Sequence, residues 1–209
     1  MKLKIPYISD NDNGMAFPSR CQLQLDCVNW KNEYPYHPEV KVNLWHNDNS
    51  LFLEYEVKED FIAALTSQDN GEVWKDSCVE LFISFDNEGY YNIEANCIGK
   101  ILMSHRQGRK VNVEYAPKEI LKLIKRNPSL GEEVLNCKKA TAPWKMTLEI
   151  PITAFFKHKL NGLQGVEAKC NIYKCGDMLP SPHFISLFPI DTEKPDFHRP
   201  EFFGNICFE

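Results

Sequence analysis

The chain has 209 residues, of which 43% are hydrophobic and 25% charged, and its formal net charge at pH 7 is −5. This composition is typical of a folded globular protein and excludes a disordered or fibrous chain. The negative charge and the lack of a basic patch argue against a nucleic-acid partner.

Targeting signals are not evident in the sequence. No stretch approaches the roughly 18 apolar residues of a membrane span, and the N-terminal residues MKLKIPYISD lack the apolar stretch of a secretory signal. We therefore expect no membrane partner. The compartment stays open: cytoplasmic as the sequence stands, extracytoplasmic if a leader is missing.

The eight cysteines form no CxxC pair and have no histidine at zinc-ligand spacing. Several fall at strand positions, where cysteine behaves as a small buried hydrophobic residue. We expect mostly free, structural thiols. One or two disulfides are the alternative.

Alternation of apolar and polar residues predicts strands along most of the chain. The predicted strands are 40–46, 51–58, 78–86, 90–98, 100–104, 144–150, 168–174, 183–188 and 203–208. So many short strands, separated by Gly, Pro, Asn and Asp clusters, indicate a sandwich or a barrel.

One helix interrupts this series. Residues 116–127, APKEILKLIKRN, carry an apolar stripe at helical spacing, and Pro117 suits a first turn. A short helical turn is also predicted at 152–157, after Pro151. The expected fold is all-β: an antiparallel β-sandwich with one helical insertion around 116–127, in a single domain spanning 1–209.

The central hairpin can be given a register. A three-residue loop at 87–89, with Gly89 in the left-handed conformation, sets the pairing. The apolar pairs would then be Phe85–Tyr91, Ile83–Ile93, Leu81–Ala95 and Val79–Cys97. On the opposite face this register pairs Glu80 with Asn96 and keeps Glu80 away from Glu94, where like charges would repel.

The segment VWKDSCVELF, residues 73–82, places Trp74, Asp76 and Glu80 on one side of a strand. An aromatic ring beside carboxylates suits a sugar, whose C–H face packs on the ring and whose hydroxyls bond polar groups. Asp76 is expected to bond local backbone amides. The alternative is structural: Trp74 caps the sandwich edge and Glu80 is solvated. A glycosidase would instead use Glu80 with Glu94 or Asp76.

The segment KPDFHRPEFFGNICFE, residues 194–209, delivers Phe197, His198 and Arg199 from a proline-bounded loop before the last strand. These side chains could close the far side of a sugar site. The structural alternative is that Phe203 fills the core, Arg199 pairs with Glu201 or Asp196, and His198 bonds backbone.

A different class of function is a haem-binding sandwich with Met, His or Lys as axial ligands. Met103 and His105 lie two apart on a predicted strand and would face one side, and Met178 is a third candidate. Packing of Met103 in the core is the simpler interpretation.

Several segments together resemble one known family. VWKDSCVELFIS, YYNIEANCIGK, WKMTLEIPITAFF (144–156) and PDFHRPEFFGNICF (195–208) are similar, in order and spacing, to blocks of the family 9 carbohydrate-binding modules and the related DOMON-like sandwiches. The resemblance spans roughly residues 40–209. It implies a β-sandwich that binds sugars without catalysis. The ligands would be xylan or cellulose oligosaccharides, held at the reducing end in association with glycoside hydrolases and polysaccharide degradation.

The resemblance also implies site residues. In the family a sugar lies between two Trp rings, with a Glu six residues after the first Trp, and Trp74 and Glu80 match that spacing. Asn96 matches an Asn of the following strand, and Lys100 stands near the expected Arg. A second Trp is not evident, and the C-terminal segment offers Phe197, with His198 and Arg199, in its place.

No cofactor is expected with certainty. The resemblance allows a structural calcium ion, for which the sequence identifies no ligands. The expected partner is an oligosaccharide or polysaccharide, and neither the particular sugar nor the oligomeric state follows from the sequence.

Overall fold

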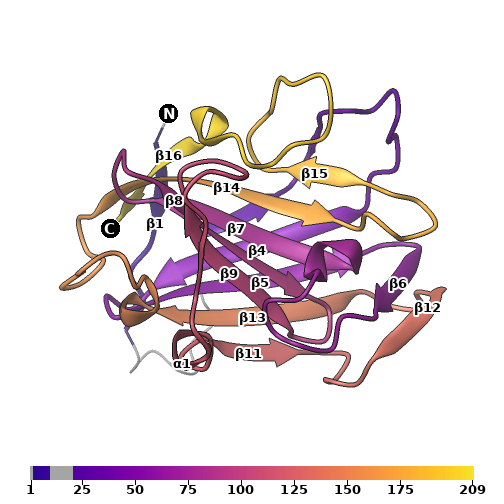
Figure 1. Ribbon diagram of the computed structural model, residues 1–209, viewed down its shortest axis with the longest axis horizontal. Helices are drawn as coiled ribbons and strands as arrows, with labels where there is room; N and C mark the ends of the chain where they lie inside the picture. The colour runs from indigo at the N-terminus through magenta and orange to yellow at the C-terminus, as the bar shows by residue number, and fades with distance from the viewer. Residues whose placement is uncertain (1, 10–20) are drawn as a thin grey trace.

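The computed structural model describes residues 2–9 and 21–209, which form two main β-sheets packed face to face (Figure 1). The strands are β1 (Leu3–Ile5), β2 (Cys21–Gln24), β3 (Cys27–Val28), β4 (Glu39–His46), β5 (Ser50–Lys58), β6 (Phe61–Ala64), β7 (Cys78–Ser84), β8 (Tyr90–Asn96), β9 (Ile101–Arg106), β10 (Glu114–Tyr115), β11 (Lys125–Pro128), β12 (Leu135–Lys139), β13 (Trp144–Pro151), β14 (Glu167–Cys175), β15 (Phe184–Ser186) and β16 (Gly204–Phe208). The helical segments are α1 (Lys118–Leu121) and the 3₁₀ turns Val73–Lys75, Ile152–Ala154 and Pro200–Phe202.

Within the described residues, the larger sheet has nine strands and the smaller one five. The larger follows the order β1-β16-β14-β7-β8-β9-β10, with β15 added beside β14 and β3 beside β15. The smaller follows β11-β13-β5-β4-β2, and β12 pairs separately with β6. Neighbouring strands are antiparallel except β1 and β16, which run parallel and bring the two chain ends together (Figure 1).

The main core lies between the sheets. The inward residues of β7, among them Val79 and Leu81, are buried against residues of the smaller sheet such as Leu53 and Leu148. A second apolar cluster lies on the other face of the larger sheet, where Phe197 and Phe203, from the segment between β15 and β16, pack with Phe82, Tyr90 and Tyr173 of the sheet. The larger sheet is therefore covered on both faces, and the second face holds the candidate site.

The all-β sandwich predicted from the sequence is confirmed, and each of the nine predicted strands is present to within two residues at either end. The predicted helix is wrong in extent. Helix α1 ends at Leu121, and the chain then forms β11, whose Arg126 pairs with Leu148 of β13. A helix of this length has little stability of its own, so the ladder with β13 prevails.

The hairpin register predicted from the sequence is also wrong, by two residues. Glu80 pairs with Glu94 and Leu81 with Ile93. The connection spans residues 85–89 because Ser84 Oγ bonds the carbonyl oxygens of Asp86 and Gly89, each at 2.6 Å. Since the slip is an even number of residues, every side chain keeps its predicted face.

All eight cysteines lie in the described residues and are free thiols, which agrees with the main expectation. In the described part of the chain, no helix has the length and apolar character needed to cross a membrane.

Candidate functional site

A pocket of about 510 Å³ opens on the outer face of the larger sheet. Its floor is formed by side chains of β7, β8, β9 and β14, and its walls come from the 3₁₀ turn at 73–75 and from two loops, around residues 109–115 and 195–198. It is lined by Trp74, Glu80, Phe82, Glu94, Leu102, Arg106, Arg109, Lys110, Val113, Tyr115, Cys175, Asp177, Phe184, Pro195, Asp196, Phe197 and His198.

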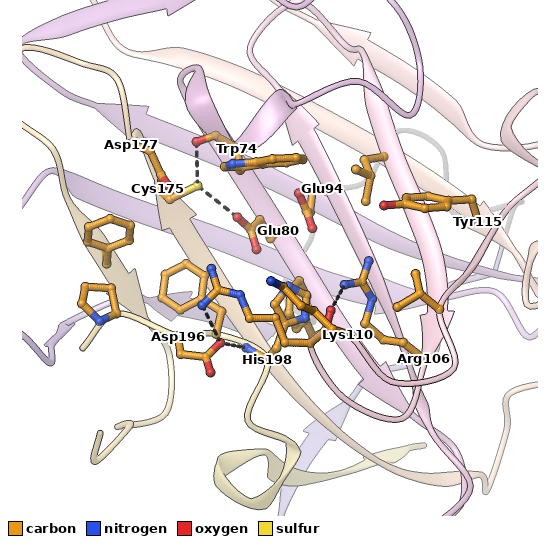
Figure 2. Close-up of a pocket in the computed structure, with 17 residues that line it drawn as sticks. Trp74, Glu80, Glu94, Arg106, Lys110, Tyr115, Cys175, Asp177, Asp196 and His198 are labelled. Carbon is orange, nitrogen blue, oxygen red and sulfur yellow. Dashed lines mark hydrogen bonds and ion pairs between the residues drawn. The ribbon is translucent and has the colours of Figure 1, made fainter. Parts of the chain in front are cut away.

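Trp74 forms one wall of this pocket. Its turn is anchored by fully buried Val73 and by β14, because the Trp74 carbonyl oxygen accepts from the Asp177 backbone N–H at 3.3 Å and the Cys175 thiol at 3.4 Å. The indole remains half-buried. Figure 2 shows it on one side of the pocket, across from Lys110 and His198, with Glu80 between them.

Asp76 holds the base of this turn, as expected from the sequence. Its carboxylate accepts from the backbone N–H groups of Leu65 and Thr66, at 2.9 and 3.1 Å, and from Asn96 Nδ2 at 2.9 Å. Asn96 also caps the β8–β9 turn by accepting from the Lys100 backbone N–H. Both side chains are thus committed to the scaffold beneath Trp74.

Glu80 and Glu94 form the acidic part of the floor. They face each other across β7 and β8, and each side chain is almost fully buried. Burial raises the pKa of Glu80 well above its usual range, and the nearby charge of Glu94 raises it further. Burial also raises the pKa of Glu94 to about 7. At neutral pH the pair therefore retains a proton.

A chain of hydrogen bonds orients Glu94. Arg106 Nε donates to Ser104 Oγ at 2.8 Å, Ser104 Oγ donates to Asn92 Oδ1, and Asn92 Nδ2 donates to Glu94 Oε1 at 2.7 Å. The second oxygen, Glu94 Oε2, is buried and has no hydrogen-bond partner among the described residues. A buried oxygen of this kind is costly unless a ligand or water supplies a donor.

The wall opposite Trp74 is mostly basic. Arg106 is buried and donates through Nη1 to the Arg109 carbonyl oxygen at 3.0 Å. The Arg109 guanidinium lies 3.7 Å from Asp196, and Lys110 is exposed beside it. Figure 2 shows Arg106, Lys110, Asp196 and His198 on this side of the pocket.

His198 is a neutral group in this wall. Burial lowers its pKa to about 3, and the charges of Arg106 and Arg109 act in the same direction. Its Nδ1 lies 3.0 Å from the Tyr90 hydroxyl. When Tyr90 donates to Nδ1, the proton of the neutral ring lies on Nε2, so His198 is left with one N–H donor. Phe197 is buried beside it and stacks on Tyr173, with ring centroids 4.1 Å apart.

The structure brings together four of the seven site residues predicted from the sequence: Trp74, Glu80, Phe197 and His198 line the pocket. The other three predicted residues do not line the pocket. Asn96 bonds Asp76, Lys100 lies 3.9 Å from Glu132, and Arg199 pairs with Glu201 at 2.6 Å, which was the structural alternative for Arg199.

Sequence reasoning missed the basic wall and the contact between Glu80 and Cys175. Arg106 could have been found, because it alternates with Leu102 and Ser104 on the polar face of β9. Arg109 and Lys110 lie in a loop whose path carries no local signal. Cys175 reaches Glu80 only because β14 pairs with β7, a relationship between segments about 90 residues apart.

The predicted haem ligands are not gathered at the pocket. Met103 is fully buried in the main core, and Met178 is 73% exposed on the surface. Among the described residues, metal-ligand atoms converge in one group of three: Cys78, Glu80 and Cys175. Two thiols do not suit calcium, which takes oxygen ligands.

Residues 12–208 match the model of carbohydrate-binding family 9. No curated protein matches the chain.

Solved structures provide closer matches. A protein from Bacteroides uniformis ATCC 8492, provisionally described as carbohydrate-binding, is 40% identical, with a TM-score of 0.89 over 100% of this chain and 97% of that one. A carbohydrate-binding module of family 9 from Caldicellulosiruptor kristjanssonii, in complex with cellotriose, is 14% identical, with a TM-score of 0.61 over 100% and 94%. Its complex with glucose gives a TM-score of 0.60 at the same identity, over 100% and 96%. At 14% identity, the similarity to the Caldicellulosiruptor module shows that the two proteins share a fold.

Proposed function

The chain belongs to carbohydrate-binding family 9, and on that premise we propose that it is a non-catalytic protein that binds an oligosaccharide in the pocket beside Trp74. The whole chain, 1–209, acts as a single binding domain. Its ligands are oligosaccharides of the cellulose or xylan type, taken at the reducing end, and its role is to support polysaccharide degradation in association with glycoside hydrolases.

One observation carries this proposal: a half-buried indole borders a floor in which a buried carboxyl oxygen, Glu94 Oε2, has no partner among the described residues. A pyranose satisfies both groups at once. Its C–H face packs on the ring of Trp74, and one hydroxyl donates to Glu94. An ordinary apolar ligand would leave the oxygen unpaired.

The remaining polar groups also suit hydroxyls, which both donate and accept. Glu80 and Glu94 together hold a proton, so the pair offers a donor and acceptors side by side. His198 presents an N–H donor, and the Lys110 ammonium group can donate to a hydroxyl oxygen of the sugar.

The comparisons support the proposed ligand class. The Caldicellulosiruptor module was solved with cellotriose and with glucose, both with a free reducing end. The present pocket has the size of a small-molecule site. The absence of a second Trp bears on affinity: the other three Trp residues all lie within the described residues, and none of them lines the pocket. We therefore expect stacking on one face only.

Calorimetric titration with cello- and xylo-oligosaccharides tests the proposal. Trp74→Ala should weaken binding by about fivefold, since an aromatic platform contributes about 1 kcal/mol. Glu94→Gln should also weaken it. The matched control is Trp45→Ala, because Trp45 stacks on Phe52 on the other sheet, away from the pocket. An absence of heat with every glycan at millimolar concentration would contradict the proposal.

The reducing-end preference has its own test. An oligosaccharide whose terminal ring has been opened by borohydride reduction should bind far more weakly than the intact sugar, because the open-chain alditol cannot stack on Trp74. Equal affinities would show that the pocket accepts internal or non-reducing residues.

A glycoside hydrolase is the second candidate, because Glu80 and Glu94 stand directly opposite each other at the pocket floor. Glycosidases use paired carboxyl groups of unequal pKa. Turnover of a chromogenic glycoside that disappears in Glu80→Gln would favour catalysis. Binding without turnover would favour the non-catalytic role.

A further inference from the structure

We propose that Cys78, Cys175 and Glu80 form a binding site for a soft divalent cation of the zinc class, at the floor of the pocket. Each residue offers one ligand atom, and the three atoms lie within 4.8 Å of one another. The site uses two thiols that the sugar proposal does not need, so the two proposals can fail separately.

The backbone brings these ligands together. Cys78 and Cys175 are direct partners across the antiparallel strands β7 and β14, and Glu80 lies two residues along β7 on the same face. The Cys175 Sγ is 3.0 Å from Glu80 Oε1. Tetrahedral zinc with bonds of about 2.3 Å to sulfur and about 2.1 Å to oxygen requires ligand atoms about 3.6–3.8 Å apart. Small side-chain rotations are enough to reach this spacing.

The ligand set selects the kind of ion. Thiolates favour zinc and similar soft ions over calcium and magnesium, and a carboxylate is an ordinary third ligand for zinc. Two thiolates and one carboxylate would leave a site with one net negative charge around a divalent ion.

The site has an entry path and an open position. Glu80 and Cys175 line the pocket, so an ion can reach them from solvent and keep its fourth position toward the pocket. Figure 2 shows Cys175 and Glu80 facing each other, with Glu94 beside Glu80. The unpartnered oxygen of Glu94 is available to accept from a water bound to the ion.

The test uses the full chain, reduced and treated with chelator. Cadmium, a spectroscopic substitute for zinc, should produce a thiolate-to-metal charge-transfer band that saturates at one ion per chain. Zinc in large excess should displace the cadmium, and calcium at the same concentration should not. Cys78→Ser and Cys175→Ser should each lower cadmium affinity by at least about tenfold, since each removes one of the protein ligands.

Exposed Cys137 provides the matched control, because Cys137→Ser removes a thiol outside the site and should leave the band unchanged. Glu80→Gln keeps both thiols and the side-chain volume, so it tests the site even if a cysteine variant fails to fold. Glu80→Gln should lower the affinity for cadmium, while the charge-transfer band of the two thiolates remains. A band that survives in the Cys78→Ser/Cys175→Ser double variant, or no band in the reduced wild-type protein, would overturn the proposal.

Discussion

Glu80 and Glu94 are direct cross-strand partners whose carboxyl groups are buried at the same pocket floor. Two like charges at opposite positions of a sheet destabilise it. The arrangement persists because burial keeps the pKa of Glu80 well above its usual value and that of Glu94 near 7, so the two groups share protons under ordinary conditions. This relationship makes both stability and ligand binding sensitive to pH.

The first prediction concerns stability and pH. Between its ordinary pKa of 4.5 and the folded value of about 7, Glu94 keeps a proton in the folded protein that the unfolded chain has lost. The free energy of unfolding should therefore fall as pH rises through this window, by about 1–3 kcal/mol. Urea denaturation at pH 5, 6, 7 and 8 measures the fall.

Glu94→Gln removes the ionisable group and keeps its shape. The variant should gain stability relative to wild type as pH rises from 5 to 8, and part of the wild-type slope should disappear. Asp177, whose pKa burial raises to about 6, contributes to the slope that remains. An identical pH profile in wild type and variant would contradict the assignment to Glu94.

The second prediction concerns the different effects of two arginines on the carboxyl groups of the pocket. The Arg106 charge lowers the pKa of Glu94 against the larger effect of burial, whereas Arg109 lowers that of Asp177. Arg106→Gln should therefore move the Glu94 titration to higher pH, and Arg109→Gln should move that of Asp177. Carbon-13 NMR of the side-chain carboxyls follows both groups. Equal shifts of both groups in both variants would show that the wall acts only through its total charge.

The alternation of residues predicted which side chains share a face. Val79 and Leu81 lie in the core and Glu80 lies at the pocket, as their positions indicated. Trp74 also lines the pocket, but from the 3₁₀ turn Val73–Lys75 before β7 and not from the strand on which the sequence placed it. The pairing across the hairpin was not predictable, because it depends on Ser84 bonding two carbonyl oxygens of the turn. Faces depend on local periodicity, whereas register depends on specific side-chain bonds.

The candidate site shows the same limit. Asn96 lies on the predicted polar face, yet its side chain donates to the carboxylate of Asp76 and accepts from the Lys100 backbone N–H. Arg109 reaches the pocket through a loop, and Cys175 through the pairing of β14 with β7. Such contacts are set by strand order and loop path, which no local pattern in the chain encodes.

The third prediction concerns a buried ion pair on the other side of β14. Lys174 is fully buried, and its Nζ lies 2.8 Å from Glu59 and 2.7 Å from His183 Nε2. Burial and the Lys174 charge lower the pKa of His183 well below its usual value, so the ring stays neutral and accepts from the ammonium.

Lys174→Met should reduce the free energy of unfolding by about 3–5 kcal/mol, because it leaves the Glu59 carboxylate buried without its counter-ion. The control is Lys145→Met, whose partner Glu56 lies 2.8 Å away at the surface. That change should cost at most about 1 kcal/mol. Urea denaturation measures the free energy of unfolding of both variants. Similar losses in the two would show that burial does not make the Lys174–Glu59 pair more important for stability than a surface pair.

The last prediction is that Asp76 controls sugar binding without lining the pocket. Its carboxylate accepts from two backbone N–H groups, of Leu65 and Thr66, and from Asn96, and so fixes the end of the turn that carries Trp74. Asp76→Ala should lower the free energy of unfolding by about 2–4 kcal/mol, because three donors lose a buried acceptor. Oligosaccharide affinity should fall as well, since Trp74 is no longer held in place. Asp76→Asn retains one acceptor oxygen and should have intermediate effects.

A second variant near the same turn tests whether Asp76 acts by holding Trp74 in place or only because a charge close to Trp74 is lost. Glu72 is exposed and pairs with Lys75 at 2.6 Å, so Glu72→Gln removes a charge close to Trp74 without touching the Asp76 bonds. Its stability and its calorimetric affinity should match those of wild type to within about 0.5 kcal/mol. If Asp76→Ala bound sugar as tightly as Glu72→Gln, then β14, through its bonds to the Trp74 carbonyl oxygen, would be sufficient to position the indole.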